Sequence, residues 1–252
     1  MQSRFLKQFI YGVLYLGILS GLSYGVYAFV VRQPNCTDGR QNQGESGIDC
    51  GGPCTSCELR QLKPIEIRSA RVFTAGEGRG IVLLEFRNEN VRYGADRFSY
   101  HATLYSDENE AVGTVTKNSF IYPGEIKFIV EPATVAGKPA RVAVELGDVV
   151  WRSIEEFSRP DVTTRDLNVE LREETEDVMV SGIVSNKDVV FLSRVVVNAI
   201  ILSTDGKKIA ASKTLLEAVE PHEERSFKIV VPRVMLTSVS RESALVSVEA
   251  ER

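Results

Sequence analysis

A run of 23 residues without a charged side chain, from Phe9 to Val31, is the strongest constraint on how this chain can fold. At about 1.5 Å per residue, a helix of that length is roughly 34 Å long, and the hydrocarbon core of a bilayer is about 30 Å thick. The run therefore predicts a transmembrane helix over residues 9–31. A signal peptide cleaved near Ala28 is the alternative, but the run is longer than the roughly 7–15 apolar residues typical of such peptides.

The charges before this run set the expected orientation. Arg4 and Lys7 lie within residues 1–8, where no acidic residue occurs, and positively charged flanks favour the cytoplasmic side of a membrane. We therefore expect a cytoplasmic stub at residues 1–8, a signal-anchor helix, and the rest of the chain outside the cytoplasm. The protein would then be a single-pass protein of the cell membrane.

Three glycines inside the run, Gly17, Gly21 and Gly25, recur at every fourth residue. In a helix this spacing places them on one face, where the missing side chains allow another helix to approach closely. The stripe is therefore a candidate helix-association surface for a homo-oligomer. Because glycine is common in membrane helices generally, the alternative is that the stripe has no partner.

All four cysteines, Cys36, Cys50, Cys54 and Cys57, lie within residues 36–57. This segment is polar and rich in Gly, and it has too few apolar residues for a core, so disulfides or a metal ion must order it. Outside the cytoplasm two disulfides are expected, and four cysteines allow three pairings. The sequence alone does not choose among the three.

Three other interpretations of the segment remain open. Asp38, Asn42, Glu45 and Asp49 offer oxygen ligands at short spacing, which indicates a calcium site, although Asp and Asn also form turns. Four thiolates would suit zinc, but an oxidising compartment disfavours that site. The terminal C-x-x-C pair suggests redox catalysis, but no βαβ pattern surrounds it. No cofactor other than calcium is expected.

The spacing C-x-D-G-x-x-N-x-x-E-x-x-x-D-C-G-G-x-C-x-x-C resembles a short cysteine motif that recurs in bacterial surface and secreted proteins. The matching residues are Cys36, Asp38, Gly39, Asn42, Glu45, Asp49, Cys50, Gly51, Gly52, Cys54 and Cys57. The resemblance implies a location outside the cytoplasm. It carries no activity that can be transferred to this chain.

Beyond the cysteines, the main signal is the alternation of apolar and polar residues. It is clear over residues 98–105, and short Val-rich runs recur at 141–146 and 244–250. Such runs, separated by Gly, Asn, Asp and Pro, are typical of strands. No long segment with a helical period follows the anchor. The fold class is therefore expected to be mainly β, with antiparallel sheets.

Two halves of this region resemble each other. A constant offset of 98 residues aligns Asn88 with Asn186, Val91 with Val189, Leu104 with Leu202, Asp107 with Asp205, and Pro123 with Pro221. Each half is about 90 residues long, a suitable size for a β-sandwich. We therefore expect two tandem sandwiches, at residues 64–152 and 163–252, with a polar connector at 153–166.

The alternation also predicts which side chains face each core. In the first sandwich they are Val82, Leu84, Phe86, Phe98, Tyr100, Ala102 and Leu104. In the second sandwich they are Val180, Val184, Val196, Ile200 and Leu202. The residues between them should face away from the core, because successive side chains of a strand point to opposite faces.

The order of strands and turns in each half is also informative. An Asn-containing turn, an Asp-containing turn and a Pro-Gly-Glu or Pro-His-Glu sequence precede a strand with Phe. This order resembles bacterial immunoglobulin-like domains of the FxLYD type. The resemblance implies two immunoglobulin-like repeats in a surface or periplasmic protein. Neither half contains a cysteine, so no disulfide is expected between sheets.

From the sequence we expect that the protein is not an enzyme. Its two histidines, His101 and His222, are expected at the surface, and no G-x-S-x-G, H-E-x-x-H or phosphate-binding motif occurs. A net charge of −4 argues against nucleic acid as a partner. The favoured function is that of a membrane-anchored structural or interaction protein of the cell envelope. The alternatives are an accessory subunit of a secretion or pilus machine, which would bind an envelope protein, and a calcium-binding surface module.

Overall fold

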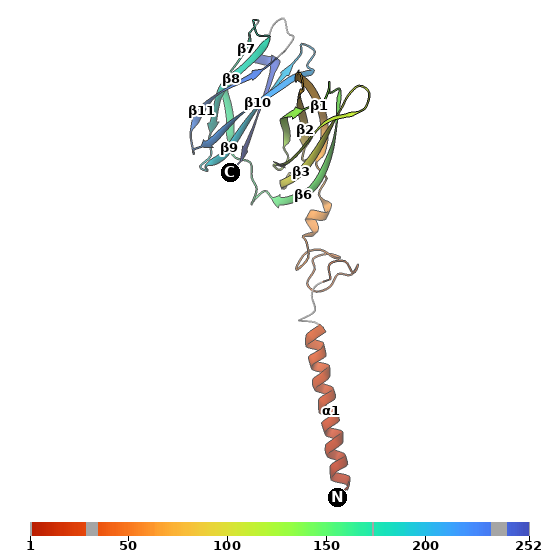
Figure 1. Cartoon of the computed structure of the whole chain (residues 1–252). Helices are drawn as coiled ribbons and strands as arrows, with labels where there is room; N and C mark the ends of the chain where they lie inside the picture. The colour runs from red at the N-terminus through yellow and green to blue at the C-terminus, as the bar shows by residue number, and fades with distance from the viewer. Residues whose placement is uncertain (1, 29–34, 173, 233–240, 252) are drawn as a thin grey trace. The chain divides into compact units, whose positions relative to one another are not determined.

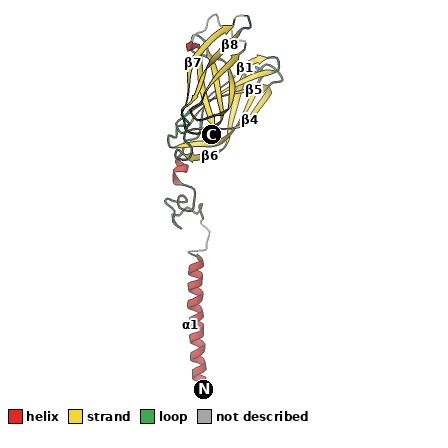
Figure 2. Ribbon diagram, turned by 90° about the vertical axis from the view of Figure 1, so that its left-hand side faces the viewer, coloured by secondary structure: helices red, strands yellow, loops and turns green. Residues whose placement is uncertain are grey.

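The computed structural model describes residues 2–28, 35–172, 174–232 and 241–251 (Figure 1). The chain divides into two compact units, Met1–Leu62 and Lys63–Arg252, and each unit is described by itself. The first unit contains a helix and the cysteine segment. Every strand found among the described residues lies in the second unit (Figure 2).

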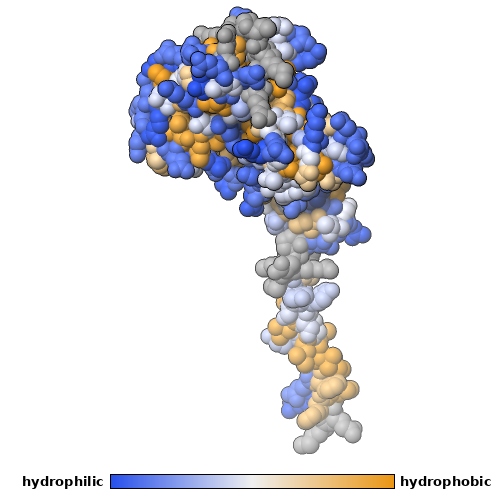
Figure 3. Space-filling model, turned by 45° about the horizontal axis from the view of Figure 1, so that its top comes forward, coloured by the Kyte–Doolittle hydropathy of each residue, from blue (hydrophilic) through white to orange (hydrophobic). Residues whose placement is uncertain are grey.

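The first unit begins with helix α1, Gln2–Val26. Its stretch Arg4–Val26 is long and apolar enough to cross a membrane, and it is not buried against the rest of the protein. Orange, hydrophobic residues recur along this helix in Figure 3, with a hydrophilic group near its N-terminal end. The helix starts before Phe9, where the predicted span begins, and residues 29–31 of that span lie outside the described residues. An apolar helix exposed in this way fits a membrane anchor or a signal sequence.

The cysteine segment is made of turns, followed by one short 3₁₀ helix, η2, at Cys57–Gln61. Two consecutive glycines fix the path of these turns, because Gly51 and Gly52 have positive φ angles of 78° and 57°. A Cβ atom on Gly52 would also collide with the carbonyl oxygen of Gly44. Glycine is therefore required at this position by both backbone conformation and space.

The described residues of the second unit form four antiparallel three-stranded sheets. The first sandwich consists of β1 (Glu66–Gly76), β2 (Arg79–Arg87), β3 (Tyr93–Tyr105), β4 (Ala111–Ile121), β5 (Ile126–Thr134) and β6 (Arg141–Ser153). The second consists of β7 (Val162–Arg172), β8 (Asp177–Asn186), β9 (Leu192–Leu202), β10 (Lys208–Val219), β11 (Glu224–Val231) and β12 (Ala244–Glu251). A 3₁₀ turn, η3 (Arg241–Ser243), precedes β12.

Both sandwiches have the same strand order. In the first, the sheets are β1-β2-β5 and β4-β3-β6, and in the second they are β7-β8-β11 and β10-β9-β12. The predicted fold class, mainly β with an N-terminal apolar helix, a disulfide-containing segment and two antiparallel sandwiches, is therefore confirmed. The connector is shorter than predicted, because β6 ends at Ser153 and β7 begins at Val162.

The core of the first sandwich agrees with the predicted pattern. All seven predicted side chains lie in one buried cluster: Val82, Leu84, Phe86, Phe98, Tyr100, Ala102 and Leu104. Three of them form an aromatic group, in which the Phe86 and Phe98 ring centroids lie 5.3 Å apart and those of Phe86 and Tyr100 lie 6.0 Å apart. Such contacts add to the free energy gained by burying the rings.

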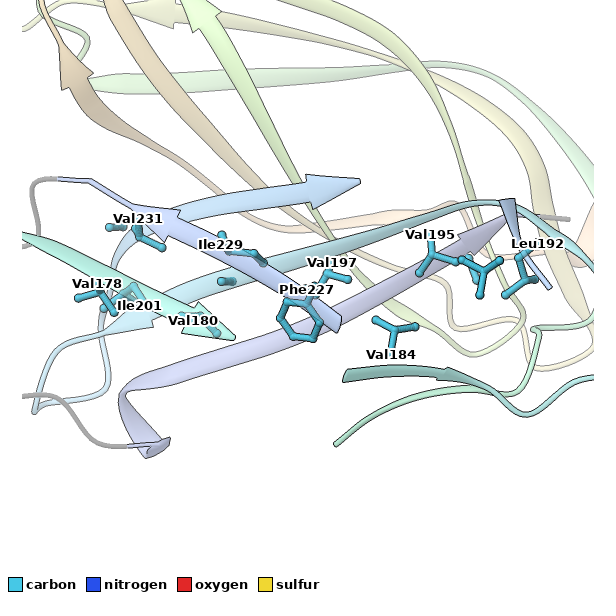
Figure 4. Close-up of a cluster of buried hydrophobic side chains, with 14 residues drawn as sticks. Val178, Val180, Val184, Leu192, Val195, Val197, Ile201, Phe227, Ile229 and Val231 are labelled. Carbon is cyan, nitrogen blue, oxygen red and sulfur yellow. The ribbon is translucent and has the colours of Figure 1, made fainter. Parts of the chain in front are cut away.

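The core of the second sandwich differs from the prediction on strand β9 (Figure 4). Val180 and Val184, on β8, lie in the core as predicted. The prediction is wrong for Val196, Ile200 and Leu202. The β9 residues in the core are Leu192, Val195, Val197, Ala199 and Ile201.

The reason is that β9 is buried on both faces. One face lines the core of its own sandwich, while Ile200 and Leu202 on the other face pack against the first sandwich. Apolar residues therefore occupy both faces, as in the β9 run from Val195 to Val197. Alternation cannot identify the inward face of such a strand.

The two sandwiches therefore differ in register by one residue along part of the chain. Leu104 pairs with Gly113 across its sheet, and Ile201 pairs with Ala210, so the core positions correspond at an offset of 97. The offset of 98 holds at Asn88 and its counterpart, is replaced by 97 through β3 and the start of β4, and returns at Ile121 and Val219 at the end of β4. A shorter loop before β9 accounts for the difference, since the Asn88 side chain bonds five residues ahead and its counterpart bonds four residues ahead.

Candidate functional site

The four cysteines form two disulfides within the first unit. Cys36 is bonded to Cys54 and Cys50 to Cys57, with Cα atoms 5.7 Å and 4.9 Å apart. Cys54 and Cys57 thus belong to different bridges, so the predicted C-x-x-C redox alternative has no disulfide of its own. No free cysteine is found among the described residues. The zinc alternative therefore lacks thiolate ligands, since a disulfide sulfur is not a thiolate.

Two of the candidate calcium ligands hold the turns together. Asp49 Oδ1 accepts hydrogen bonds from the backbone N–H groups of Asp38 and Gly39, at 2.8 Å and 3.0 Å. Glu45 Oε2 accepts from the N–H groups of Asn42 and Asp49, both at 3.2 Å. These carboxylates satisfy main-chain donors that no regular secondary structure satisfies.

The other two candidate ligands continue the same network. Asp38 Oδ2 accepts a hydrogen bond of 2.9 Å from Asn42 Nδ2, and Asp38 Oδ1 accepts one of 2.9 Å from Arg40 N. The hydrogen bond from Asn42, followed by that from Arg40, lowers the pKa of Asp38 below its ordinary value. The four oxygen-bearing residues therefore lie together as the sequence suggests, and their side chains form hydrogen bonds with each other and with backbone N–H groups. Calcium binding stays a prediction.

Glu45 also lies beside a disulfide, with its Oε1 3.1 Å from Cys54 Sγ. Glu45, Cys36 and Cys54 bring one carboxylate and two sulfurs within 4.8 Å of one another. Both sulfurs are bonded to each other, so this group does not supply a metal with thiolates.

The sandwiches meet through the outer faces of two sheets in the second unit. Leu83 and Val130, from β2 and β5, are buried together with Ile200 and Ala211, from β9 and β10. The partly buried side chains around them are Phe73, Ile81, Phe128 and Leu202. The contact therefore has an apolar centre, which is separate from the core of either sandwich.

Three ion pairs join the sandwiches around this centre. Lys127 Nζ lies 2.7 Å from Glu249 Oε2, and Lys213 Nζ lies 3.0 Å from Glu131 Oε1. Lys208 pairs with Glu85. Burial alone would raise the pKa of Glu85, but the hydrogen bond and charge of Lys208 outweigh burial and lower this pKa. Each pair takes its acid and its base from different sandwiches.

Lys127 is the most deeply buried of these charges, since its side chain is 1% exposed. Its Nζ lies 3.4 Å from the ring centroid of Phe120, and its approach to Glu249 lies outside hydrogen-bond geometry. Glu249 also accepts a hydrogen bond of 2.8 Å from Asn198 Nδ2, which donates to the Phe128 carbonyl at 3.1 Å as well. This network places polar groups from both sandwiches in direct contact.

A groove runs beside this network and is formed by both sandwiches. It consists of two adjoining cavities with volumes of about 390 Å³ and about 240 Å³. Asp96, Phe120, Arg152 and Glu251 line both cavities, so the two are continuous. Sequence reasoning did not find the groove, because its residues come from five strands and from the segments that follow β4 and β6, and they share no local pattern. Only a knowledge of how the sandwiches pack would have identified it.

The remaining candidate residues give no site among the described parts of the chain. His101 is exposed, and its Nδ1 lies 2.6 Å from Thr116 Oγ1. His222 is exposed in the turn before β11. Gly17, Gly21 and Gly25 lie on α1, and no described atom lies within 4 Å of a Cβ built on them. Helix association therefore stays a prediction.

Comparison with known proteins identifies no family. No family model matches the chain, and no curated protein matches it. Among solved structures 51 chains match. One is the crystal structure of red sea bream transglutaminase, 14% identical, with a TM-score of 0.22; the match covers 76% of this chain and 30% of that one. The chain thus spans less than a third of that protein, and this degree of similarity supports no conclusion about fold or function.

Proposed function

We propose that the protein is a single-pass, membrane-anchored interaction protein that holds two joined β-sandwiches outside the cytoplasm. The exposed apolar surface of Arg4–Val26 supports the anchor. The two disulfides support an oxidising compartment, because disulfides persist there and are rare in the cytosol. A structure with these parts suits display of a binding surface.

One observation carries the proposal most strongly, namely the charged and apolar contact between the sandwiches. Domains in one chain usually move relative to one another unless the interface is well packed. Here Lys127 is buried against Glu249 of the other sandwich, and Leu83 is buried against Ile200. The sandwiches therefore act as one body, which can present a surface made from both of them.

We also assign the sandwiches to the immunoglobulin-like repeats that the sequence resembles. The identical strand order of the two halves supports this assignment. Equivalent hydrogen bonds also support it, since the Asn88 and Asn186 side chains each donate two hydrogen bonds to main-chain carbonyls. A repeated module is in keeping with an interaction protein.

Surface labelling tests the location. We would introduce a cysteine at Glu108, which is exposed in the β3–β4 turn, and one at Gln2 as the matched control. A membrane-impermeant maleimide should label Glu108→Cys in intact cells, and should label Gln2→Cys only after lysis. The opposite pattern would reverse the topology. Release of Glu108→Cys into the medium without α1 would show that the helix is a cleaved signal sequence.

A further inference from the structure

From the groove between the sandwiches we infer a binding site for a neutral oligosaccharide. This inference rests on the proposed function, in which the sandwich pair is the part that meets other molecules. The larger cavity has a volume of about 390 Å³, within the size range of small-molecule sites, and such sites often lie where domains meet. The chemistry of the lining then selects the class of ligand.

The charges in the larger cavity balance each other. The six charged side chains are Asp96, Arg97, Arg152, Arg194, Glu249 and Glu251. Arg152 Nε lies 3.0 Å from Asp96, and Arg194 lies 2.9 Å from Glu251. Glu249 pairs with Lys127 outside the cavity, and no ion pair to Arg97 is found among the described residues. The lining still has three acidic and three basic side chains, so a charged ligand of either sign would meet repulsion from like charges, and a neutral ligand avoids this cost.

The paired groups still have hydrogen-bonding capacity. A guanidinium has five N–H donors and a carboxylate has about four acceptor sites, and one ion pair uses only some of them. The Arg152 side chain is 51% exposed and that of Arg194 is 52% exposed, so their remaining donors are accessible. Adjacent donors and acceptors match the vicinal hydroxyl groups of a sugar, each of which both donates and accepts.

Aromatic rings supply the apolar side of the site. Phe120 lines both cavities, and Phe157 lines the smaller one. Their centroids lie 6.1 Å apart in an edge arrangement, and Phe157 is stacked on Tyr122 at 4.6 Å. Both phenylalanines are partly exposed. The C–H face of a sugar ring can pack on a partly exposed aromatic face, which is apolar and carries negative potential.

The site depends on both sandwiches. Asp96, Arg97 and Arg152 come from the first sandwich, and Arg194 and Glu251 come from the second. The contact through Lys127 and Glu249 keeps the two sides in place. Neither sandwich alone would contain the groove, so the inference also gives the fixed pairing a function.

Calorimetric titration tests the inference with the full chain in a detergent that has no sugar head group. The probes are four neutral tetrasaccharides (chitotetraose, cellotetraose, maltotetraose and mannotetraose), with a glutamate-rich and a lysine-rich decapeptide as charged competitors. At least one tetrasaccharide should bind with a dissociation constant on the order of 0.1 mM. Neither peptide should bind or compete.

Two variants and a control locate the binding. Phe120→Ala should weaken it at least about tenfold, because a central aromatic contact is lost. Phe120 also contacts Lys127, so Arg97→Gln is the second variant; no ion pair to Arg97 is found among the described residues, and its loss should weaken binding severalfold without affecting folding. Phe191→Ala, at an exposed ring outside the groove, should bind like the wild type.

The outcomes separate this inference from the proposed function. If no tetrasaccharide binds, or a peptide binds instead, or both groove variants bind like the wild type, the inference is overturned. Labelling of Glu108→Cys on intact cells would in that case still support the membrane-anchored function. Groove-dependent binding together with labelling only after lysis would keep the saccharide site and reject the proposed location.

Discussion

Asn88 and Asn186 make the same hydrogen bonds in the two sandwiches. Asn88 Nδ2 donates to the carbonyls of Tyr93 and Tyr122, at 2.7 Å and 3.0 Å. Asn186 Nδ2 donates to those of Val190 and Glu220, at 3.0 Å and 2.9 Å. The two side chains are 1% and 0% exposed. Each asparagine thus ties the loop after one strand to the turn before another, and supplies bonds that the strands cannot.

Replacing either asparagine should be costly. Asn88→Ala or Asn186→Ala leaves two carbonyls without their donor in a buried place, so we expect each change to lower the free energy of unfolding by about 2–3 kcal/mol. Urea unfolding of the full chain in detergent would measure it. Asn109→Gly is the control, because Asn109 lies exposed in a turn with a φ of 68°, which glycine adopts freely. Equal stability of all three variants would contradict the assigned role.

The turns beside these asparagines provide a second matched pair. Gly124 and His222 have φ angles of 67° and 61°, in the left-handed region. A Cβ atom at Gly124 would lie 3.7 Å from Val91, an ordinary contact, so only backbone strain opposes a side chain there. We expect Gly124→Ala to destabilise by about 1 kcal/mol.

His222→Gly tests the same strain in the opposite direction. It relieves the strained conformation but makes the unfolded chain more flexible, so we expect a change smaller than about 1 kcal/mol. Gly137→Ala is the control, because Gly137 has no positive φ and a Cβ would lie 3.6 Å from Val112. Thermal unfolding should show no loss for this control. A loss equal to that of Gly124→Ala would show that backbone conformation is not the cause.

Local patterns were sufficient to predict some parts of this fold. An uncharged run predicts the helix, and cysteine spacing with the expected compartment predicts two disulfides. Alternation identified the core of the first sandwich, because β3 faces its core on one side and has residues such as Ser99 and His101 on the other. In each case the deciding residues lie close together in the sequence.

Contacts between distant segments could not be predicted in this way. Which cysteine pairs with which depends on turns set by Gly51 and Gly52. Which face of β9 is inward depends on the first sandwich covering Ile200. The groove depends on the same packing, since Arg97 and Arg194 come from different sandwiches and line one cavity only when the two are packed together. Charged residues in the strands gave no local sign of this contact.

The corrected register of β9 can be tested with neighbouring residues. Ile201→Ala creates a cavity in the core of the second sandwich and should lower the free energy of unfolding by about 2–5 kcal/mol. Leu202→Ala removes a partly buried contact between the sandwiches and should lower the free energy of unfolding by less. Denaturant unfolding compares them, with Leu215→Ala at an exposed position as the control. A larger loss for Leu202→Ala would restore the original register.

Glu125 and Glu223 occupy equivalent turns but respond to pH in opposite directions. Each accepts a hydrogen bond from the backbone N–H three residues earlier, at 2.8 Å and 2.7 Å. Burial raises the pKa of Glu125. The hydrogen bond from Glu220 and that from Arg225 lower the pKa of Glu223. Burial thus decides the sign.

The sign gives a pH dependence for each. A raised folded pKa means that Glu125 contributes stability below the ordinary glutamate range, near pH 4.3, and that this contribution is lost as pH rises through the folded pKa. The free energy of unfolding of Glu125→Gln should therefore rise relative to that of the wild type as the pH increases. Glu223→Gln should lose the stability that its carboxylate provides above the ordinary range. Urea unfolding from about pH 4 to pH 8 would measure both. Parallel curves for the two variants would contradict the assignment.

The ion pair between Lys127 and Glu249 gives the last prediction. Lys127→Ala leaves Glu249, whose side chain is 13% exposed, without its partner charge, which should lower the free energy of unfolding by about 3 kcal/mol. Replacing both together, Lys127→Met with Glu249→Leu, removes the charges and keeps much of the volume, so most of the loss should be recovered. The control is Lys63→Ala, since Lys63 is 68% exposed and its pair with Glu89 should contribute less than about 1 kcal/mol.

Calorimetry of these variants also tests whether the sandwiches unfold together. The wild type should show one transition for the second unit, because the buried contact couples its two sandwiches. Lys127→Ala should separate it into two, and the double variant should restore one. Trp151, the chain's single tryptophan, packs against the first core. Its fluorescence therefore identifies the transition of that sandwich. Two transitions already in the wild type would show that the sandwiches are independent, and the groove would then have no fixed shape.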